Sequence, residues 1–187
     1  DSQGNYLERL LRAFDGYSLA VELRHRSWSD RQDEVLRLLH AHAAAWVQID
    51  EPKFRTSIRQ NLLPNERGLY YMRLHGRNAA AWWAHDKSED RYNYLYSADE
   101  LTEFSETITA TREIVKKTYV YTNNHFSAKS IANAAMIKQQ VGDPITGDYP
   151  ESFVNEYPAL RDMLQQRSAP TAHAHARAPV KPATLFP

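Results

Sequence analysis

The chain has 187 residues, of which 42% are apolar and 25% are charged, proportions that are ordinary for a globular domain with its own core. Lys and Arg together number 23, as do Asp and Glu, so no net charge draws the whole chain towards nucleic acid or an anionic membrane. Cysteine is absent, which excludes disulfides, thiolate metal sites and cysteine nucleophiles and is typical of a reducing, cytoplasmic compartment. No apolar run approaches the roughly 18 residues of a membrane span, and the opening DSQGNYLERL is too polar for a secretory signal.

Hydrophobic periodicity predicts strands that alternate with helices. We expect strands over 19–24, 45–49, 69–74 and 118–122. We expect helices over 6–14, 131–141 and 158–166, and another that ends near 43. One further helix should begin at a capping box of Ser97 and Glu100 and continue to about 115. The segments 51–67 and 77–97 are expected to be loops.

This order predicts an α/β fold with parallel strands. Four strands are half of an eight-stranded barrel, which typically needs about 250 residues. The chain starts at Asp1 without a methionine and leads with part of a helix, which favours a truncated TIM-like (β/α) barrel of about four βα units over a small open sheet. We expect this domain to cover residues 1–166, followed by a disordered tail over 167–187 that is rich in Ala, Pro and His.

Three of the predicted strands turn polar at their carboxyl ends, where α/β proteins bind ligands. Strand alternation places Glu22 and Arg24 on one face, and it likewise places Arg73 and His75 together. A buried parallel strand is normally apolar on both faces, so these charges must pair with one another or line a wet cavity. Two interpretations stay open: a structural ion pair between Glu22 and an arginine, and arginines that hold a phosphate or carboxylate.

Further polar residues at the strand ends are suited to proton transfer and hydrogen bonding. His25 and His75 are candidates for a general acid or base, although a histidine at a strand end is often structural. Asp50 is a candidate base, metal ligand or turn cap. Asn123 and Asn124 should point to opposite faces, so at most one can reach a ligand, and asparagine also suits the turn that ends a strand.

A metal site is not predicted. His25, Asp50, His75 and His125 would converge at one rim, but their spacing matches no metal motif. The sequence also lacks the glycine-rich nucleotide motifs and the serine elbow, and it leaves the cofactor open.

The loop 77–97 is unusually aromatic. Its rings lie beside Arg77, Lys87 and Arg91, and they are Trp82, Trp83, Tyr92, Tyr94 and Tyr96. Such a stretch can stack on bases, or it can be a hydrophobic latch that covers the rim of a barrel.

The chain resembles the DUF72 family, whose members are also called YecE-like proteins. The resemblance rests on VELRHRSW (21–28), IDEP (49–52), YMRLHGRN (71–78), RYNYLYS (91–97), VYTNNHF (120–126) and Asn133-Ala134. It implies a TIM-like barrel of which this chain is similar to the C-terminal part, without the family's GTSGW-like opening and FQFPP-like segment. The family carries no established activity, so the resemblance assigns no roles to the matched polar residues. These are Glu22, Arg24, His25, Asp50, Arg73, His75, Asn123 and Asn124.

Together these observations favour a barrel enzyme that binds a small anionic substrate at the strand tips. Arg24 and Arg73 would hold the anion, and His75 would move protons with Asp50 or Glu22 as its partner. Asn124 would orient the substrate, with His25 and Asn123 as further contacts. The alternative is a nucleic-acid-associated module that uses residues 77–96 and the tail. A membrane partner is not expected, and the oligomeric state stays open.

Overall fold

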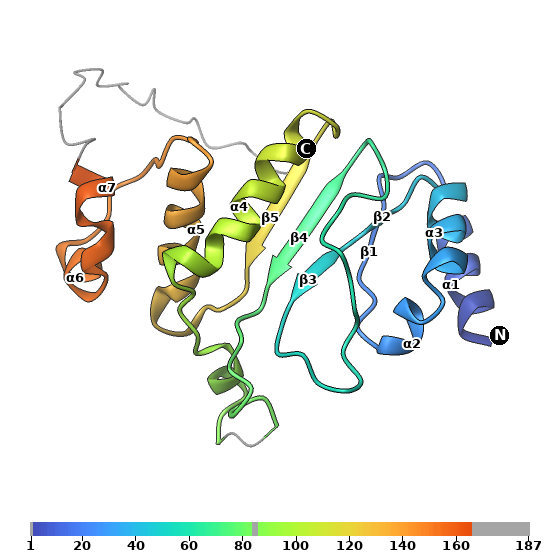
Figure 1. Cartoon of the computed structure of the whole chain (residues 1–187), viewed down its shortest axis with the longest axis horizontal. Helices are drawn as coiled ribbons and strands as arrows, with labels where there is room; N and C mark the ends of the chain where they lie inside the picture. Colours follow the sequence, from blue (N-terminus) through green and yellow to red (C-terminus); the bar gives the residue numbers. More distant parts are fainter. Residues whose placement is uncertain (1, 84–85, 166–187) are drawn as a thin grey trace, which may run out of the picture. The chain divides into compact units, whose positions relative to one another are not determined.

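The computed structural model describes residues 2–83 and 86–165, and the chain divides after Asp148 into two compact units. The strands of the first unit are β1 (Ala20–Val21), β2 (Ala45–Trp46), β3 (Gln48–Asp50), β4 (Tyr70–Leu74) and β5 (Thr118–Thr122). Its helices are α1 (Ser2–Ala13), α2 (Arg26–Ser29), α3 (Gln32–Ala41), η1 (Ser88–Tyr92), α4 (Ala98–Arg112), η2 (Phe126–Ala128) and α5 (Lys129–Gln140) (Figure 1). The described helices include none long and apolar enough to cross a membrane.

All strand pairs of the two described sheets are parallel, which confirms the α/β prediction. β1 pairs with β2 through Ala20 and Ala45, and β3, β4 and β5 form a second sheet in which Tyr70 lies opposite Thr118. Only Val47 separates β2 from β3, so the strand order is effectively β1, β2/β3, β4, β5 (Figure 1). Neither sheet closes on itself within the described residues.

β1 is shorter than the strand expected over 19–24, because the following residues bond to a different segment. The Ile58 amide donates to the Arg24 carbonyl at 2.9 Å, and the Arg26 amide donates to the Thr56 carbonyl at 2.8 Å. An isolated antiparallel bridge joins His25 to Ser57. The polar segment 51–69 therefore takes the main-chain hydrogen bonds at the end of this strand. The periodicity of the strand's own residues cannot predict such a contact.

A side chain interrupts the strand expected over 45–49. Gln60 donates from its Nε2 to the Val47 carbonyl at 2.8 Å and accepts from the Ile49 amide at 3.1 Å. The amide group thus takes the place of a neighbouring strand at this point. β2 and β3 consequently end up in different sheets although they are nearly continuous.

The two faces of the sheet differ in burial. Tyr70, Met72 and Leu74 alternate onto one face and are fully buried, while Tyr71 and Arg73 alternate onto the other face and are half-buried. α4 packs against β5 and α5 on the side where Figure 1 shows these helices. The buried face therefore carries the helices, and the face of Tyr71 and Arg73 is the more open one.

The capping box predicted at the start of α4 is confirmed. The Ser97 hydroxyl accepts from the Glu100 amide at 3.2 Å, and the Glu100 carboxylate accepts from the Ser97 amide at 2.9 Å. Leu101, Phe104 and Ile108 are buried, as the helical spacing predicts.

The second unit holds α6 (Glu151–Glu156), η3 (Pro158–Leu160) and α7 (Arg161–Gln165). The helix expected over 158–166 is thus split between η3 and α7, and α6 was not expected. Phe153 ties this unit together by ring contacts with Tyr149 and Tyr157 at centroid distances of 5.6 and 5.0 Å. The tail expected over 167–187 lies outside the described residues.

Candidate functional site

An ion pair between Glu22 and Arg73 lies on the open face of the sheet. Arg73 donates from an Nη atom to Glu22 Oε2 at 2.5 Å and from Nε to Asn123 Oδ1 at 2.9 Å. Glu22 follows β1, and Arg73 belongs to β4, so the pair reaches across the intervening strand. Side chains from three separate segments of the chain therefore meet here, as strand alternation predicted.

A second pair extends this cluster towards the loops. Arg24 bonds to Glu51, and its guanidinium also lies 3.7 Å from Glu22 Oε1. The Glu51 side chain is 6% exposed and was not among the residues predicted for the site. The signal was the IDEP segment, where Glu51 directly follows the predicted strand.

His75 is buried beside this cluster without a hydrogen bond to its ring. The residue is 1% exposed, and neither ring nitrogen has a hydrogen-bond partner among the described residues. Its Nε2 lies 3.8 Å from Glu22 Oε1, which is too long for a hydrogen bond but places the imidazole next to the carboxylate. Buried polar groups are almost always bonded, so an unsatisfied imidazole is a candidate functional group.

The pKa of Glu22 reflects its neighbours. Burial acts to raise it, but the His75 imidazole and the Arg73 guanidinium outweigh burial and lower the pKa from 4.5 to about 2. Glu22 is therefore an anion throughout the physiological range. It can accept a proton only when the positive charges beside it move away or are neutralised.

This lowered pKa predicts a pH-dependent contribution to stability. A carboxyl group whose pKa falls on folding stabilises the protein above pH 4.5, and that contribution is lost as pH falls towards 2. We expect the free energy of unfolding of the native chain to exceed that of Glu22→Gln by about 1–2 kcal/mol more above pH 4.5 than near pH 2, after allowance for screening by water. Urea denaturation of both proteins across this range measures the difference, because the other carboxyl groups titrate in both. A difference that stays constant with pH contradicts the lowered pKa.

A cavity of about 290 Å³ opens beside Arg24. Its polar lining includes Arg24, His25 and Glu51, and its aromatic lining is Phe54, Trp82, Trp83 and Tyr92. The Arg24 guanidinium lies 6.0 Å from the centroid of the Trp82 ring. This cavity borders the charged cluster through Arg24 and Glu51.

His25 has a structural contact at the mouth of this cavity. It is the N-cap of α2, where its Nδ1 accepts from the Ser27 amide at 3.2 Å. The residue is exposed, and its ring nitrogen also lies 2.9 Å from the Ser27 hydroxyl. The structure therefore places His25 beside the cavity, with its Nδ1 atom used to cap the N-terminus of α2.

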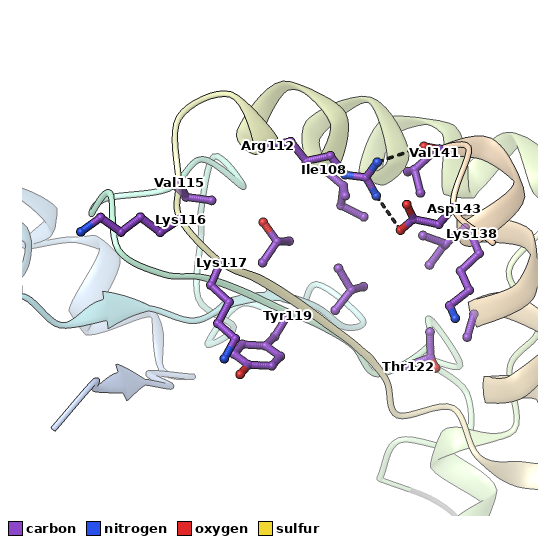
Figure 2. A pocket seen from close by; sticks show the side chains of 14 residues that line it. Ile108, Arg112, Val115, Lys116, Lys117, Tyr119, Thr122, Lys138, Val141 and Asp143 are labelled. Carbon is purple, nitrogen blue, oxygen red and sulfur yellow. Dashed lines mark hydrogen bonds and ion pairs between the residues drawn. The ribbon is translucent and has the colours of Figure 1, made fainter. Parts of the chain in front are cut away.

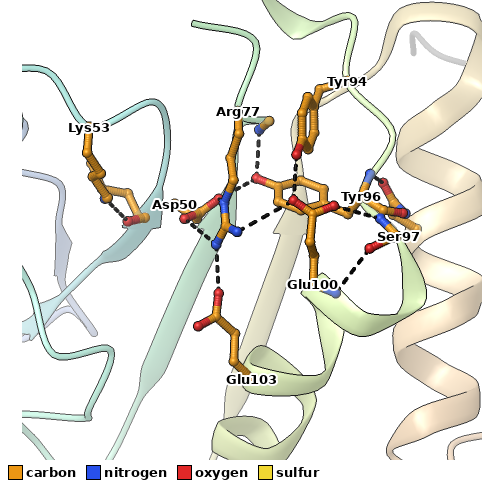
Figure 3. A network of polar contacts seen from close by, with 11 residues as sticks. Asp50, Lys53, Arg77, Tyr94, Tyr96, Ser97, Glu100 and Glu103 are labelled. Carbon is orange, nitrogen blue, oxygen red and sulfur yellow. Dashed lines mark hydrogen bonds and ion pairs between the residues drawn. The ribbon is translucent and has the colours of Figure 1, made fainter.

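Asp50 lies apart from these residues, on the face that carries the helices. Arg77 binds its carboxylate through two nitrogens at 2.8 and 3.0 Å, and the Tyr96 hydroxyl donates to it at 2.7 Å. Figure 3 shows Arg77 between Asp50 and Glu103, to which it also donates at 2.6 Å. Asp50 and His75, expected to act together, share only a main-chain bond from the His75 amide to the Asp50 carbonyl at 2.9 Å.

Arg77 is the centre of this second network. Its guanidinium lies within 3.6 Å of a third carboxylate, Glu100, and over the Phe104 ring. Burial acts to lower its pKa, but bonds to Asp50 and Glu103 outweigh it and hold the pKa above the ordinary value. Arg77 was expected beside rings that could stack on a ligand, whereas in the structure its guanidinium binds carboxylates.

Gly76 allows this network to form at the end of β4. Its φ is +90°, and a Cβ at this position would lie 2.7 Å from the Cβ of Tyr94. Its amide donates to the Tyr96 hydroxyl at 2.8 Å. A residue with a side chain would be strained here and would displace the aromatic segment.

Asn123 and Asn124 point to opposite faces, as expected. Asn123 bonds to Arg73 on the open face, whereas Asn124 is fully buried and donates to the Tyr94 carbonyl and to Asn133, both at 2.7 Å. Asn133 also exchanges two hydrogen bonds with the main chain of Tyr96, at 3.0 and 2.8 Å. Asn124 therefore lies among structural contacts that hold the segment after η1.

Most of the aromatic side chains of the segment 77–97 are buried or packed against other residues. Tyr96 is fully buried, Trp82 is 7% exposed, and the Tyr92 ring lies 5.1 Å from that of His125. Trp83 is 74% exposed and contacts the Phe54 ring at 5.7 Å. No group of three or more His, Asp or Glu residues in the described part of the chain is arranged to hold a metal ion.

Another cavity, of about 510 Å³, lies among α4, β5 and α5, away from the charged cluster (Figure 2). Its basic side chains are Arg112, Lys116, Lys117 and Lys138. Arg112 is neutralised by Asp143 at 2.6 Å, and Figure 2 shows Lys116 extending away from the centre of the cavity. The lysines therefore do not converge on one point.

Comparisons with known proteins point to one family. The model of the family described as "Protein of unknown function DUF72" matches residues 1–154. The UPF0759 protein YunF of Bacillus subtilis is 25% identical over 141 residues, which are 72% of this chain and 50% of that protein. A crystal structure of a DUF72 family protein from Thermotoga maritima is 34% identical, with a TM-score of 0.68, and the match covers 75% of this chain and 52% of that one. A DUF72 family protein from Enterococcus faecalis, 24% identical, has a TM-score of 0.72 over 81% of this chain and 57% of its own. The chain thus spans about half the length of these relatives.

Proposed function

Because the chain belongs to the DUF72 family, whose function is not established, we propose that its strand tips bind a small anionic ligand and support acid–base chemistry on it. The ligand carries a phosphate or a carboxylate. The proposed fold behind this site is part of a TIM-like (β/α) barrel, with the four strand positions of this chain as about half of its wall. The reach of the Glu22–Arg73 pair across an intervening strand supports a concave, barrel-like face.

The observation that carries the proposal is the unsatisfied imidazole of His75. A fully buried histidine with two unbonded nitrogens destabilises the protein unless something supplies the missing bonds. Glu22 Oε1 lies 3.8 Å from the ring and places a negative charge beside it. A bound ligand that offers an oxygen to His75 would complete its hydrogen bonding, and the imidazole could then donate or accept a proton.

The arginines supply the binding part of the proposal. Arg24 lines the cavity, whereas Arg73 is not one of its lining residues and is bound to Glu22 and Asn123. Guanidinium groups recognise planar and tetrahedral anions through paired hydrogen bonds. An incoming phosphate would compete with Glu51 for Arg24, and His25 would add a donor at the mouth of the cavity. Of the two carboxylates expected to partner His75, Glu22 has the suitable position, and Asp50 serves to fix Arg77.

Nucleic acid is less well supported as the ligand. Base stacking by the segment 77–96 would need free rings and free cations, but Tyr96 is fully buried and Arg77 is held by carboxylates. Trp83 is the one ring of this segment that is mostly exposed among those described.

The test is a titration of the full chain with inorganic phosphate and, separately, with succinate, followed by NMR of the histidine rings and arginine side chains. We expect shifts of the His75 ring and of Arg24, and we expect Arg24→Gln to weaken binding at least about tenfold because a charge-assisted bond is lost. Arg12→Gln, which removes an exposed guanidinium on α1, is the matched control and should bind like the native chain.

Three outcomes contradict the proposal. The first is the absence of any response of His75 to either anion at millimolar concentration. The second is equal binding by the native chain and Arg24→Gln. The third is preferential binding of a single-stranded oligonucleotide that quenches Trp83 fluorescence and weakens steeply with salt, which would favour the nucleic-acid alternative.

A further inference from the structure

The aromatic rings that line the cavity beside Arg24 are inclined to one another. The Phe54 ring makes angles of 43° and 52° with the rings of Trp82 and Trp83, and the Trp82 and Tyr92 rings meet edge to face at 72°. None of these pairs is parallel, so they do not form a slot in which a flat ring stacks on both sides. The face of an aromatic ring has a negative potential, which attracts the weakly positive C–H groups of a sugar ring. The aromatic lining therefore favours a saccharide over a planar ligand.

Glu51 adds a requirement that a bare anion does not meet. Arg24 donates to its carboxylate, and no other group within residues 2–83 and 86–165 forms a hydrogen bond to it. An anion that takes the Arg24 guanidinium, as proposed above, leaves this nearly buried carboxylate without a donor. Such a loss is costly unless the ligand itself donates to the carboxylate. The ligand therefore needs a hydroxyl group next to its anion.

The lining of the cavity also limits the size and the charge of the ligand. The volume of about 290 Å³ is at the lower end of the range of about 300–1,000 Å³ that is typical of small-molecule pockets. Arg24 and Arg91 both line the cavity, and the carboxylate among its lining residues is Glu51. Two guanidinium groups beside one carboxylate favour a ligand with an anionic group. These limits fit one sugar ring that carries one anion.

We infer that the ligand is a monosaccharide with a phosphate or carboxylate on its ring, bound with the anion on Arg24 and a neighbouring hydroxyl on Glu51. The C–H groups of the sugar ring lie against Trp83, which is 74% exposed and lines the same cavity. The inference rests on the proposed function, because it names the class of ligand for the same site.

The experiment titrates the full chain with four probes and follows the heat of binding. The probes are glucose 1-phosphate, phenyl phosphate, inorganic phosphate and glucose. The first two both carry a phosphate directly on a six-membered ring, but only the sugar ring is puckered and has a hydroxyl on the adjacent carbon. We expect glucose 1-phosphate to bind at least about tenfold more tightly than each of the other three, because a site built to hydrogen-bond a hydroxyl rejects analogues that lack it.

Two variants assign the preference to the cavity. Trp83→Ala should weaken glucose 1-phosphate binding at least about fivefold and leave the binding of inorganic phosphate unchanged. The matched control is Tyr17→Ala, since Tyr17 is also 74% exposed and does not line the cavity. Glu51→Gln should narrow the preference for the sugar phosphate at least about fivefold, because it removes the charged acceptor of the hydroxyl and also the anion that competes with phosphate for Arg24.

The probes separate a failure of this inference from a failure of the proposed function. If no probe with a phosphate binds, both are wrong. If inorganic phosphate binds as tightly as glucose 1-phosphate, the anion site remains and the sugar ring has no role. Equal or tighter binding of phenyl phosphate would show that the ligand is planar, and equal binding of glucose would show that the anion is not recognised. Equal effects of Trp83→Ala and Tyr17→Ala, or an unchanged preference in Glu51→Gln, would also overturn the inference.

Discussion

Arg77→Met is expected to lower the free energy of unfolding by about 3–5 kcal/mol, the loss typical of breaking a buried ion pair from one side. The Asp50 side chain is 7% exposed and would keep only the Tyr96 hydroxyl as its bonded partner in the network. Methionine preserves much of the aliphatic length, so the loss reports the missing charge and hydrogen bonds more than an empty volume. Urea denaturation near neutral pH measures the effect.

Two further variants separate the buried contact from the exposed one. Glu103→Gln removes a partner of Arg77 whose side chain is 54% exposed, and it should cost less than about 1 kcal/mol. Adding Asp50→Asn to Arg77→Met should recover part of the lost stability, since no unpaired charge then remains buried. If Glu103→Gln destabilises as much as Arg77→Met, the buried pair with Asp50 is not the important contact.

Asn133→Ala is expected to cost about 3 kcal/mol, because one fully buried amide satisfies three other polar groups. Without it, the amide and the carbonyl of Tyr96 lose their bonds to this side chain, and the side-chain amide of Asn124 keeps only its bond to the Tyr94 carbonyl. The same substitution also leaves a small cavity under the aromatic segment. Chemical denaturation measures the loss, and amide hydrogen exchange should show faster exchange at Tyr96.

The matched control is Asn5→Ala, which makes the same change at an exposed position of α1. It should alter stability by less than about 0.5 kcal/mol. A loss at Asn133 no greater than that at Asn5 would mean that water replaces the buried bonds, and the segment after η1 would then be held by its rings alone.

Local patterns were sufficient to predict the elements that depend on local physics. β4, β5 and the capping box of α4 lie within a residue or two of the predicted positions, because strand propensity and the hydrogen bonds of Ser97 and Glu100 are determined nearby. The expected single strand over 45–49 is interrupted because Gln60, eleven residues beyond Ile49, takes the place of a strand. Local periodicity cannot predict that a distant side chain replaces a neighbouring strand as the hydrogen-bond partner.

The candidate site divides in the same way. Alternation along a strand was enough to bring Glu22 and Arg73 to one face and to separate Asn123 from Asn124. It could not assign Asp50 to Arg77, since that contact depends on the turn at Gly76, where a positive φ redirects the chain. A glycine directly after a predicted strand was the available signal, but it does not tell which partner the next side chain will find.

The two polar networks described above lie back to back on the same strands, with the sheet as the wall between them. Asp50 anchors Arg77 on one side, while its carbonyl accepts the amide of His75, whose ring belongs with Glu22 on the other side. Changes in the residues of the proposed ligand site therefore leave the anchoring carboxylates untouched. A substitution on one face of the sheet can therefore change the charge that this face presents without loosening the contacts that hold the other.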